Sequence, residues 1–206
     1  MKTRIIIFLI AVFTVNGLYA QTNDLTEEIK QTISDFAKQR VDQFNDQLSF
    51  IAGKKKYGDD VKDKYIRQAL KNFIGGGNDY RNEETGELIK APTMEVSSIN
   101  RRNGFVTVNK LPIKTYLNNL KNLRYSEISV TSSSAHFITE IKQVSENEYE
   151  TVMSYAQIFV GKRDMRVVYS DETEKHVRIH IKRIDLGDGQ VKWNVLLGDI
   201  MVKATK

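Results

Sequence analysis

The chain has 206 residues, with 31 Lys and Arg against 26 Asp and Glu, a formal charge of +5, and no cysteine. The absence of cysteine excludes disulfides, thiolate metal sites, cysteine nucleophiles and acyl anchoring through an N-terminal cysteine. The small positive charge is too weak to favour nucleic acid or an anionic membrane as the natural partner.

The first twenty residues have the layout of a secretory signal peptide. Lys2 and Arg4 precede an apolar run over residues 5–15, and Ala20 is a small residue before a polar stretch. The run is shorter than the roughly 20 residues that a spanning helix needs, although an uncleaved anchor is the alternative. We therefore expect residues 1–20 to be a signal peptide and residues 21–206 to form a single exported domain, periplasmic or extracellular, with no membrane anchor after cleavage.

Helices are predicted only before residue 124. Apolar residues recur at steps of three and four over residues 24–51, which indicates a long amphipathic helix with Gly53 as a left-handed C-cap. A second helix is predicted over residues 59–74 and ends at the glycines 75–77, and a short third helix follows Pro112. The one-sided stripe of the long helix predicts that it lies against a sheet.

Period-two alternation predicts mostly antiparallel strands in the rest of the chain. A hairpin is expected at Asn103-Gly104, and polar turns are expected at Asp171-Glu172 and Asp188-Gly189. The expected strands cover residues 93–99, 105–108, 125–132, 136–144, 149–160, 165–169, 175–185 and 190–202. The fold class that follows is α+β, in one domain.

The Asp188-Gly189 turn sets a register for the last two strands. It pairs Val177 with Ile200, Ile179 with Gly198 and Ile181 with Leu196 on an apolar core face. It also predicts an Arg178–Asp199 ion pair, worth ~0.2–1 kcal/mol, on a second face of mixed polarity. We expect a helix or loop of the same domain, a second copy of the chain, or a ligand to cover that second face. Its candidate ligand- or partner-binding residues are Trp193, His180, His176, Arg178, Asp199 and Leu197.

Several chemistries are excluded or left without a motif. His176 and His180 are four residues apart on a predicted strand, roughly 13 Å, which is too far for two ligands of one zinc ion. No Gly-x-Ser-x-Gly elbow is present. Acid/base catalysis needs only two or three well-placed groups and no fixed sequence motif, so the sequence does not exclude it. We expect no metal and no cofactor.

The order of elements, a long N-terminal helix followed by further helices and a strand meander, resembles the nuclear-transport-factor-2-like or cystatin-like cone fold. The stretches 94–98, 116–123 and 193–200 resemble exported proteins of gut Bacteroidetes whose function is unassigned. The resemblance implies a curved antiparallel sheet wrapped around the N-terminal helix. It also implies a pocket that holds a carboxylate or histidine in those members that are isomerases or dehydratases. The resemblance assigns no catalytic residue to this chain, because the sequence contains no catalytic motif of the family to match.

Two functions follow as hypotheses. The first is an exported, non-catalytic module that binds a small molecule, glycan or protein partner, with a homodimer as a further option. The alternative is a cofactor-free acid/base lyase or isomerase, which requires a buried carboxylate or histidine with a shifted pKa in a cavity.

Overall fold

The long N-terminal helix is present in the computed structural model, which describes residues 25–206 except 54–57, 84 and 101. Helix α1 (Glu27–Ala52) begins after Thr26, whose side chain accepts a hydrogen bond from the Ile29 amide. Its buried stripe includes Ile33, Val41, Phe44 and Leu48, at the expected helical spacing. Gly53 has φ −67°, so the predicted left-handed C-cap is wrong. The predicted signal peptide lies outside the described residues.

Two shorter helices follow α1. Helix α2 (Asp59–Leu70) ends earlier than predicted, and the chain then turns through the short 3-10 helix η1 (Ile74–Gly77). The three glycines of that turn all have positive φ, which only glycine adopts without strain, so they form the predicted turn but do not end α2, which stops at Leu70. Helix α3 (Ile113–Lys121) follows Pro112, as expected. Within the described ranges, none of the helices is long and apolar enough to cross a membrane.

The strands form one large curved sheet and a small hairpin. The large sheet has the order β4-β3-β10-β9-β8-β5, with β6 and β7 paired to β8, and β1 pairs with β2. The bounds are β1 Tyr80–Arg81, β2 Leu88–Ile89, β3 Thr93–Ile99, β4 Val106–Pro112, β5 Glu127–Ser132, β6 His136–Phe137, β7 Lys142–Gln143, β8 Glu148–Arg163, β9 Arg166–Gly187 and β10 Gln190–Thr205. All pairings between these strands are antiparallel except the contact between β3 and β10 at Met94 and Ile200, which makes the sheet mixed.

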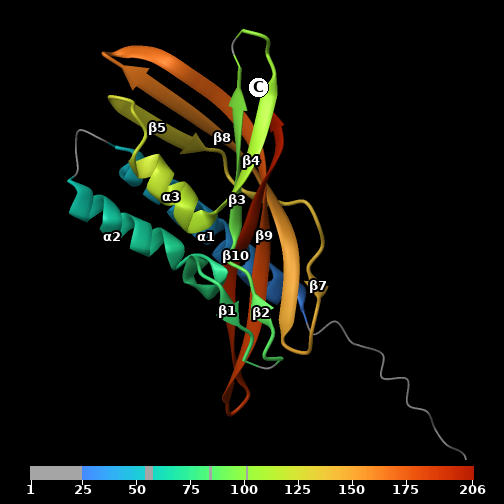
Figure 1. Cartoon of the computed structure of the whole chain (residues 1–206). Coiled ribbons are helices and arrows are strands. Elements are labelled where there is room, and N and C mark those ends of the chain that lie inside the picture. Colours follow the sequence, from blue (N-terminus) through green and yellow to red (C-terminus); the bar gives the residue numbers. More distant parts are fainter. Residues whose placement is uncertain (1–24, 54–57, 84, 101) are drawn as a thin grey trace, which may run out of the picture.

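The sheet wraps around α1, with α2 and α3 beside it (Figure 1). Helix α1 packs against β5, β6 and β10, and its buried stripe joins the inward side chains of β8, β9 and β10 in one core. The expected α+β class, a curved sheet around the N-terminal helix, is therefore confirmed. The concave side of the sheet holds the core, and the convex side is here called the outer face.

Two bulges change the register predicted for β9 and β10. Val177 faces Ile200 as expected, but between the bulges at residues 190–191 and 197–200 the partners shift by one. Ile179 therefore faces Leu197 and not Gly198. Because alternate strand residues point to opposite faces, this shift turns Leu197 into the core.

Strand β9 is also longer than predicted. It runs without interruption from Arg166 to Gly187, so the turn expected at Asp171-Glu172 does not exist. The connection to β8 is instead made at Asp164 and Met165, which both have positive φ. Residues 169, 171, 173 and 175 therefore continue the inward-facing row of the strand.

Candidate functional site

The six residues predicted to share a binding face do not lie on one face. Leu197 is fully buried in the core, and Trp193 packs edge-to-face on the buried Tyr149 with ring centroids 5.7 Å apart. The bulge near Gly198 moves Asp199 away from the predicted ion pair. Its carboxylate accepts hydrogen bonds from the Thr93 amide at 2.8 Å and the Thr93 hydroxyl at 2.7 Å.

The other three, His176, Arg178 and His180, lie on the outer face. His176 Nε2 lies 3.3 Å from Glu174 Oε1, at the sheet surface. Arg178 and His180 line a groove of about 460 Å³ between β8, β9 and β10 and the β1–β2 hairpin, here called the outer groove. That hairpin covers part of this face, which is one of the three coverings expected from the sequence. No ion pair joins Arg178 to Asp199, although both are among the described residues.

His180 is the most constrained residue of the outer groove. Its Nδ1 lies 3.0 Å from Glu150 Oε1, and its ring lies over Gly198, where a Cβ would come within 2.5 Å of Nε2. Burial lowers the pKa of His180, and the Glu150 carboxylate opposes that shift. The contact with Glu150 and the packing over Gly198 explain His180 without a ligand.

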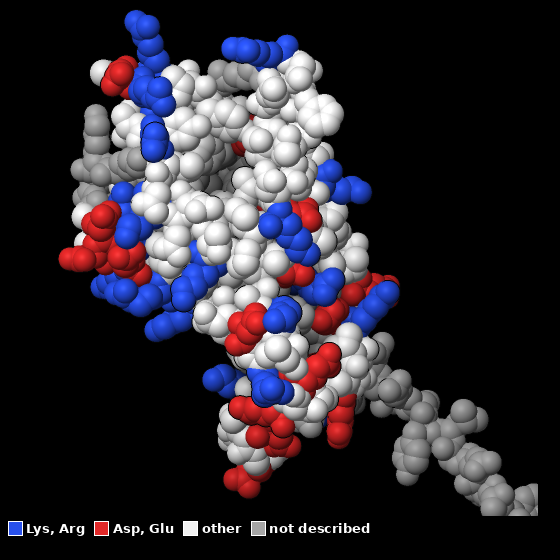
Figure 2. Space-filling view, viewed as in Figure 1, with Lys and Arg blue, Asp and Glu red and all other residues white. Residues whose placement is uncertain are grey.

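A second cavity opens on the concave side of the sheet, beside the β3–β4 hairpin. It has a volume of about 310 Å³ and is here called the cone pocket. Apolar side chains form most of its wall, and a row of polar side chains from β9 crosses it. Its lining is Val96, Ser97, Ser98, Leu111, Tyr116, Asn119, Leu120, Leu123, Tyr125, Gln157, Phe159, Tyr169, Asp171, Thr173 and Lys175. Figure 2 shows a hollow between this hairpin and α3, with acidic atoms inside it.

Asp171 is the buried carboxylate of the cone pocket. The Tyr169 hydroxyl donates a hydrogen bond of 2.5 Å to its Oδ2. Burial raises the pKa of Asp171, while that hydrogen bond and the positive charge of Lys175 oppose the rise. Burial, followed by the hydrogen bond to Asp171, raises the pKa of Tyr169 to about 12. Tyr169 therefore stays protonated at neutral pH and keeps donating to the carboxylate.

Lys175 lies four residues further along the same inward row. Its side chain is buried, with only 4% of the residue exposed, and Nζ donates to the Glu95 carbonyl at 3.1 Å. Burial lowers the pKa of Lys175 to about 8, against the charges of Asp171 and Glu95. The pocket thus holds a carboxylate and an amine whose charged forms are both disfavoured by burial.

Two buried polar groups that lack a hydrogen-bond partner neighbour residues of the cone-pocket lining. The Asn45 amide oxygen accepts from Gln157 Nε2 at 3.1 Å, but Asn45 Nδ2 has no partner, although only 4% of this residue is exposed. The hydroxyl of Tyr155 is likewise unpartnered, and Tyr155 interacts electrostatically with Tyr116 of the pocket lining. Burial raises the pKa of both tyrosines, so both hydroxyls remain donors. Unpaired buried donors are costly, and an acceptor atom of a ligand or water would satisfy them.

This constellation was missed at the level of sequence, although a signal for it exists. The core residues Val177, Ile179 and Ile181 alternate with outward residues. Extending that alternation backwards by steps of two reaches Lys175 and Asp171, which were read as a strand start and a turn. Polar residues in the inward phase of a strand indicate either a buried network or a site.

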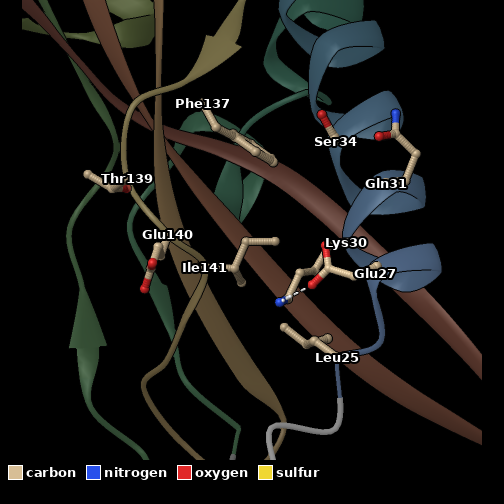
Figure 3. A pocket seen from close by; sticks show the side chains of 9 residues that line it. All are labelled: Leu25, Glu27, Lys30, Gln31, Ser34, Phe137, Thr139, Glu140 and Ile141. Carbon is tan, nitrogen blue, oxygen red and sulfur yellow. Dashed lines mark hydrogen bonds and ion pairs between the residues drawn. The ribbon is translucent and has the colours of Figure 1, made fainter.

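A third hollow, of about 450 Å³, lies between the start of α1 and the segment that joins β6 to β7. Figure 3 shows Phe137 and Ile141 pointing toward α1, with the Glu27–Lys30 ion pair between them and Leu25. The ion pair is largely exposed, and none of the polar side chains that line this hollow is buried. This hollow therefore offers apolar contact to a ligand but no buried polar group that could take part in catalysis.

No cluster of three or more His, Asp or Glu side chains able to hold a metal ion occurs in the part of the chain that the structure describes. Among the cavities described, the cone pocket is therefore the one whose side chains are best suited to catalysis or ligand binding. It combines an apolar wall, a carboxylate with a raised pKa, a buried amine, and the hydroxyl of Tyr116 and the amide of Gln157 in its lining.

No family model and no curated protein matches this sequence. Among solved structures, a protein assigned as a scytalone dehydratase from Novosphingobium aromaticivorans is similar, with 11% identity, a TM-score of 0.42, and coverage of 87% of this chain and 88% of that one. A hexachlorocyclohexane dehydrochlorinase, LinA type 2, has 9% identity, a TM-score of 0.34, and coverage of 85% and 91%. The protein Kfla4162 from Kribbella flavida has 10% identity, a TM-score of 0.35, and coverage of 84% and 94%.

Proposed function

We propose that the cone pocket binds a small molecule with a carbonyl or carboxyl oxygen and moves a proton at a neighbouring carbon. The protein would then be a cofactor-free acid/base lyase or isomerase. The observation that carries this proposal is Asp171, a buried carboxylate with a raised pKa, held by Tyr169 in a cavity with a mostly apolar wall. Such a group is poised to accept a proton once water is excluded.

The neighbouring groups have complementary roles in this proposal. The Asp171 carboxylate takes the proton from the carbon, and the electron pair of the broken C–H bond moves toward the carbonyl oxygen. The hydroxyl of Tyr116, which lines the pocket, can donate to that oxygen as its negative charge develops, which is the largest single contribution in many enzymes. In an isomerase Asp171 returns the proton to another carbon. In a lyase a leaving group departs with the electron pair, and the new acid Asp171 supplies its proton.

Proton exchange provides a test that needs no knowledge of the natural substrate. Cyclic ketones from cyclohexanone to 2-tetralone are incubated with the protein in D2O, and loss of the α-proton signal is followed by NMR. We expect Asp171→Asn to abolish exchange above the buffer rate. The matched control is Glu172→Gln, the next residue on β9, which points to the outer face and should exchange at the wild-type rate. Equal exchange by the wild type and Asp171→Asn would contradict the assignment.

Non-catalytic binding in the same pocket is the second candidate function, because the unpartnered groups Asn45 Nδ2 and the Tyr155 hydroxyl favour a ligand whether or not it reacts. Binding of 2-tetralone without any exchange would favour this function. A glycan or protein partner, and a homodimer, are further options that the residues of the outer groove leave open. We propose no nucleic-acid partner.

We also propose that the protein acts outside the cytoplasm, without a membrane anchor, after removal of residues 1–20. This proposal is supported by Lys2 and Arg4, the apolar run over residues 5–15 and the small Ala20. Mass spectrometry of the protein recovered from the periplasm or medium should find an N-terminus at or near Gln21. An intact Met1 would contradict it.

A further inference from the structure

Two hairpins extend past the end of β10 on the same side of the sheet. The last residues of β10 pair with Thr173 and Glu174 of β9, so β8 and β9 continue beyond them to the turn at Asp164 and Met165. Strand β3 runs parallel to β10 and leads to the β3–β4 turn in the same direction. Figure 1 shows the two hairpins diverging at this end. Residues of both hairpins line the cone pocket, so its mouth lies between them.

The turn of the β8–β9 hairpin holds an unusual residue. Asp164 and Met165 have φ of 50° and 66°, the left-handed region that two-residue turns usually assign to glycine at the second position. The two-residue β9–β10 turn follows that rule, with Gly189 at 75°, and the longer β3–β4 turn also places a glycine, Gly104, at a positive φ of 68°. Met165 is 91% exposed, so its side chain packs against nothing that would offset the backbone strain. Neither the turn nor the core explains a methionine here.

The other hairpin presents a similar tip. Phe105, directly after Gly104, is 68% exposed, and Val106 and Val108 next to it are also exposed. The two tips are basic: residues 100–107 and 161–168 hold five Lys and Arg and a single acidic residue. Arg102 and Arg163 form no ion pair with any other described residue.

The opposite end of the molecule has the reverse charge. Residues 83–87, 145–150 and 185–189, in the turns and adjoining strand ends of the β1–β2, β7–β8 and β9–β10 hairpins, hold eight acidic residues and no basic one. Figure 2 shows mostly blue charged side chains at the two upper tips, and red ones at the lowest tip with blue ones interspersed above it. The charge distribution would therefore orient the molecule with its two tips toward an anionic surface.

We propose that the tips of the β3–β4 and β8–β9 hairpins dock this protein peripherally on an anionic phospholipid surface, through Phe105, Met165 and the arginines beside them. Each tip is an isolated apolar side chain beside cations, which suits the interface of acyl chains and headgroups. Two separate, diverging tips do not form the contiguous apolar patch that a protein partner usually covers. In this orientation the mouth of the cone pocket faces the membrane. This docking is independent of any chemistry in the pocket and differs from an anchor.

Vesicle sedimentation tests the proposal. The probes are vesicles of phosphatidylcholine alone and of phosphatidylcholine mixed with phosphatidylglycerol, at low and high salt. Because residues 5–15 are themselves apolar, the protein is taken as the cell releases it, and mass spectrometry verifies that all variants share one N-terminus. The tip variants are Met165→Gly and Phe105→Ser. Glycine suits the φ of Met165, so the first variant keeps the fold. The control is Leu186→Ser, which alters a 60% exposed leucine at the acidic end.

We expect the wild type to sediment with the anionic vesicles only, and less at high salt. Each tip substitution should weaken the partition about tenfold, as for the loss of one buried apolar side chain. Arg163→Gln should weaken it about fivefold, and Leu186→Ser should leave it unchanged. The proposal is wrong if the wild type does not sediment with anionic vesicles, or if the tip variants sediment with them as well as the wild type does. It is also wrong if light scattering shows that they turn a dimer into a monomer, because the tips would then be a protein interface.

Discussion

Raising the pH should stabilise the fold over the range in which Lys175 loses its proton. Burial lowers the pKa of this residue to about 8 from an ordinary 10.5. Between these two values the unfolded chain binds a proton that the folded chain has released. The free energy of unfolding therefore rises with pH in that range, the reverse of what an exposed salt-bridged lysine produces.

The size of the effect follows from the two pKa values. A full unit of difference contributes about 1.4 kcal/mol. Over the window from pH 8 to about 9.5, where the folded-state lysine passes from half to almost fully neutral, the gain is ~1.5 kcal/mol. Above that window the tyrosines of the unfolded chain begin to titrate. Because burial raises the pKa of Tyr116 and Tyr155, their titration lowers stability there.

Urea unfolding at a series of pH values measures this gain directly. Trp193 is the only tryptophan and is half-buried against Tyr149, so its fluorescence reports the transition. Lys175→Met should remove the rise between pH 8 and about 9.5. The control Lys203→Met changes an exposed lysine of β10, and this variant should keep the rise in stability between pH 8 and about 9.5. A flat or falling wild-type profile, or the same rise in Lys175→Met, would refute the reasoning.

Three further substitutions test the packing around the cone pocket and β10. Tyr155→Phe deletes an unpaired hydroxyl, so it should lower the free energy of unfolding by less than about 1 kcal/mol or raise it. Denaturant unfolding measures this change, and a large loss of stability would show that the hydroxyl is hydrogen-bonded. Gly161→Ala should destabilise by about 1–3 kcal/mol, because its Cβ would lie 2.8 Å from the Tyr125 ring; an unchanged melting temperature would contradict this contact. Trp193→Ala should cost up to about 3 kcal/mol, measured by circular dichroism, through lost contact with Tyr149; a neutral result would return Trp193 to the second face of mixed polarity first predicted.

The architecture could be predicted because its signals are local. The stripe of α1 and the alternation of the strands are periodic over many residues, so small errors in their ends do not alter the fold class. The register of β9 and β10 needed more than the Asp188-Gly189 turn, because a bulge inserts a residue and reverses all faces beyond it. Gly198 inside the strand, followed by Ile200 out of phase with Leu197, is the sequence mark of that bulge.

The candidate site was less predictable because it depends on elements far apart in the chain. Asn45 from α1 meets Gln157 from β8, a separation of 112 residues that no spacing rule encodes. Asp171 was assigned to a turn because acidic residues are usual there. Only the continuous course of β9 shows that its side chain points into the core.

Direct titration of Asp171 is the measurement closest to the central claim, that this residue is the proton acceptor of the cone pocket. Carboxyl carbons of aspartate are labelled with ¹³C, and Asp171→Asn identifies the signal. The account predicts a titration midpoint above the ordinary 3.8 in the folded protein, which rises further in Lys175→Met because a nearby positive charge is removed. A midpoint at or below 3.8 in the folded protein would contradict it.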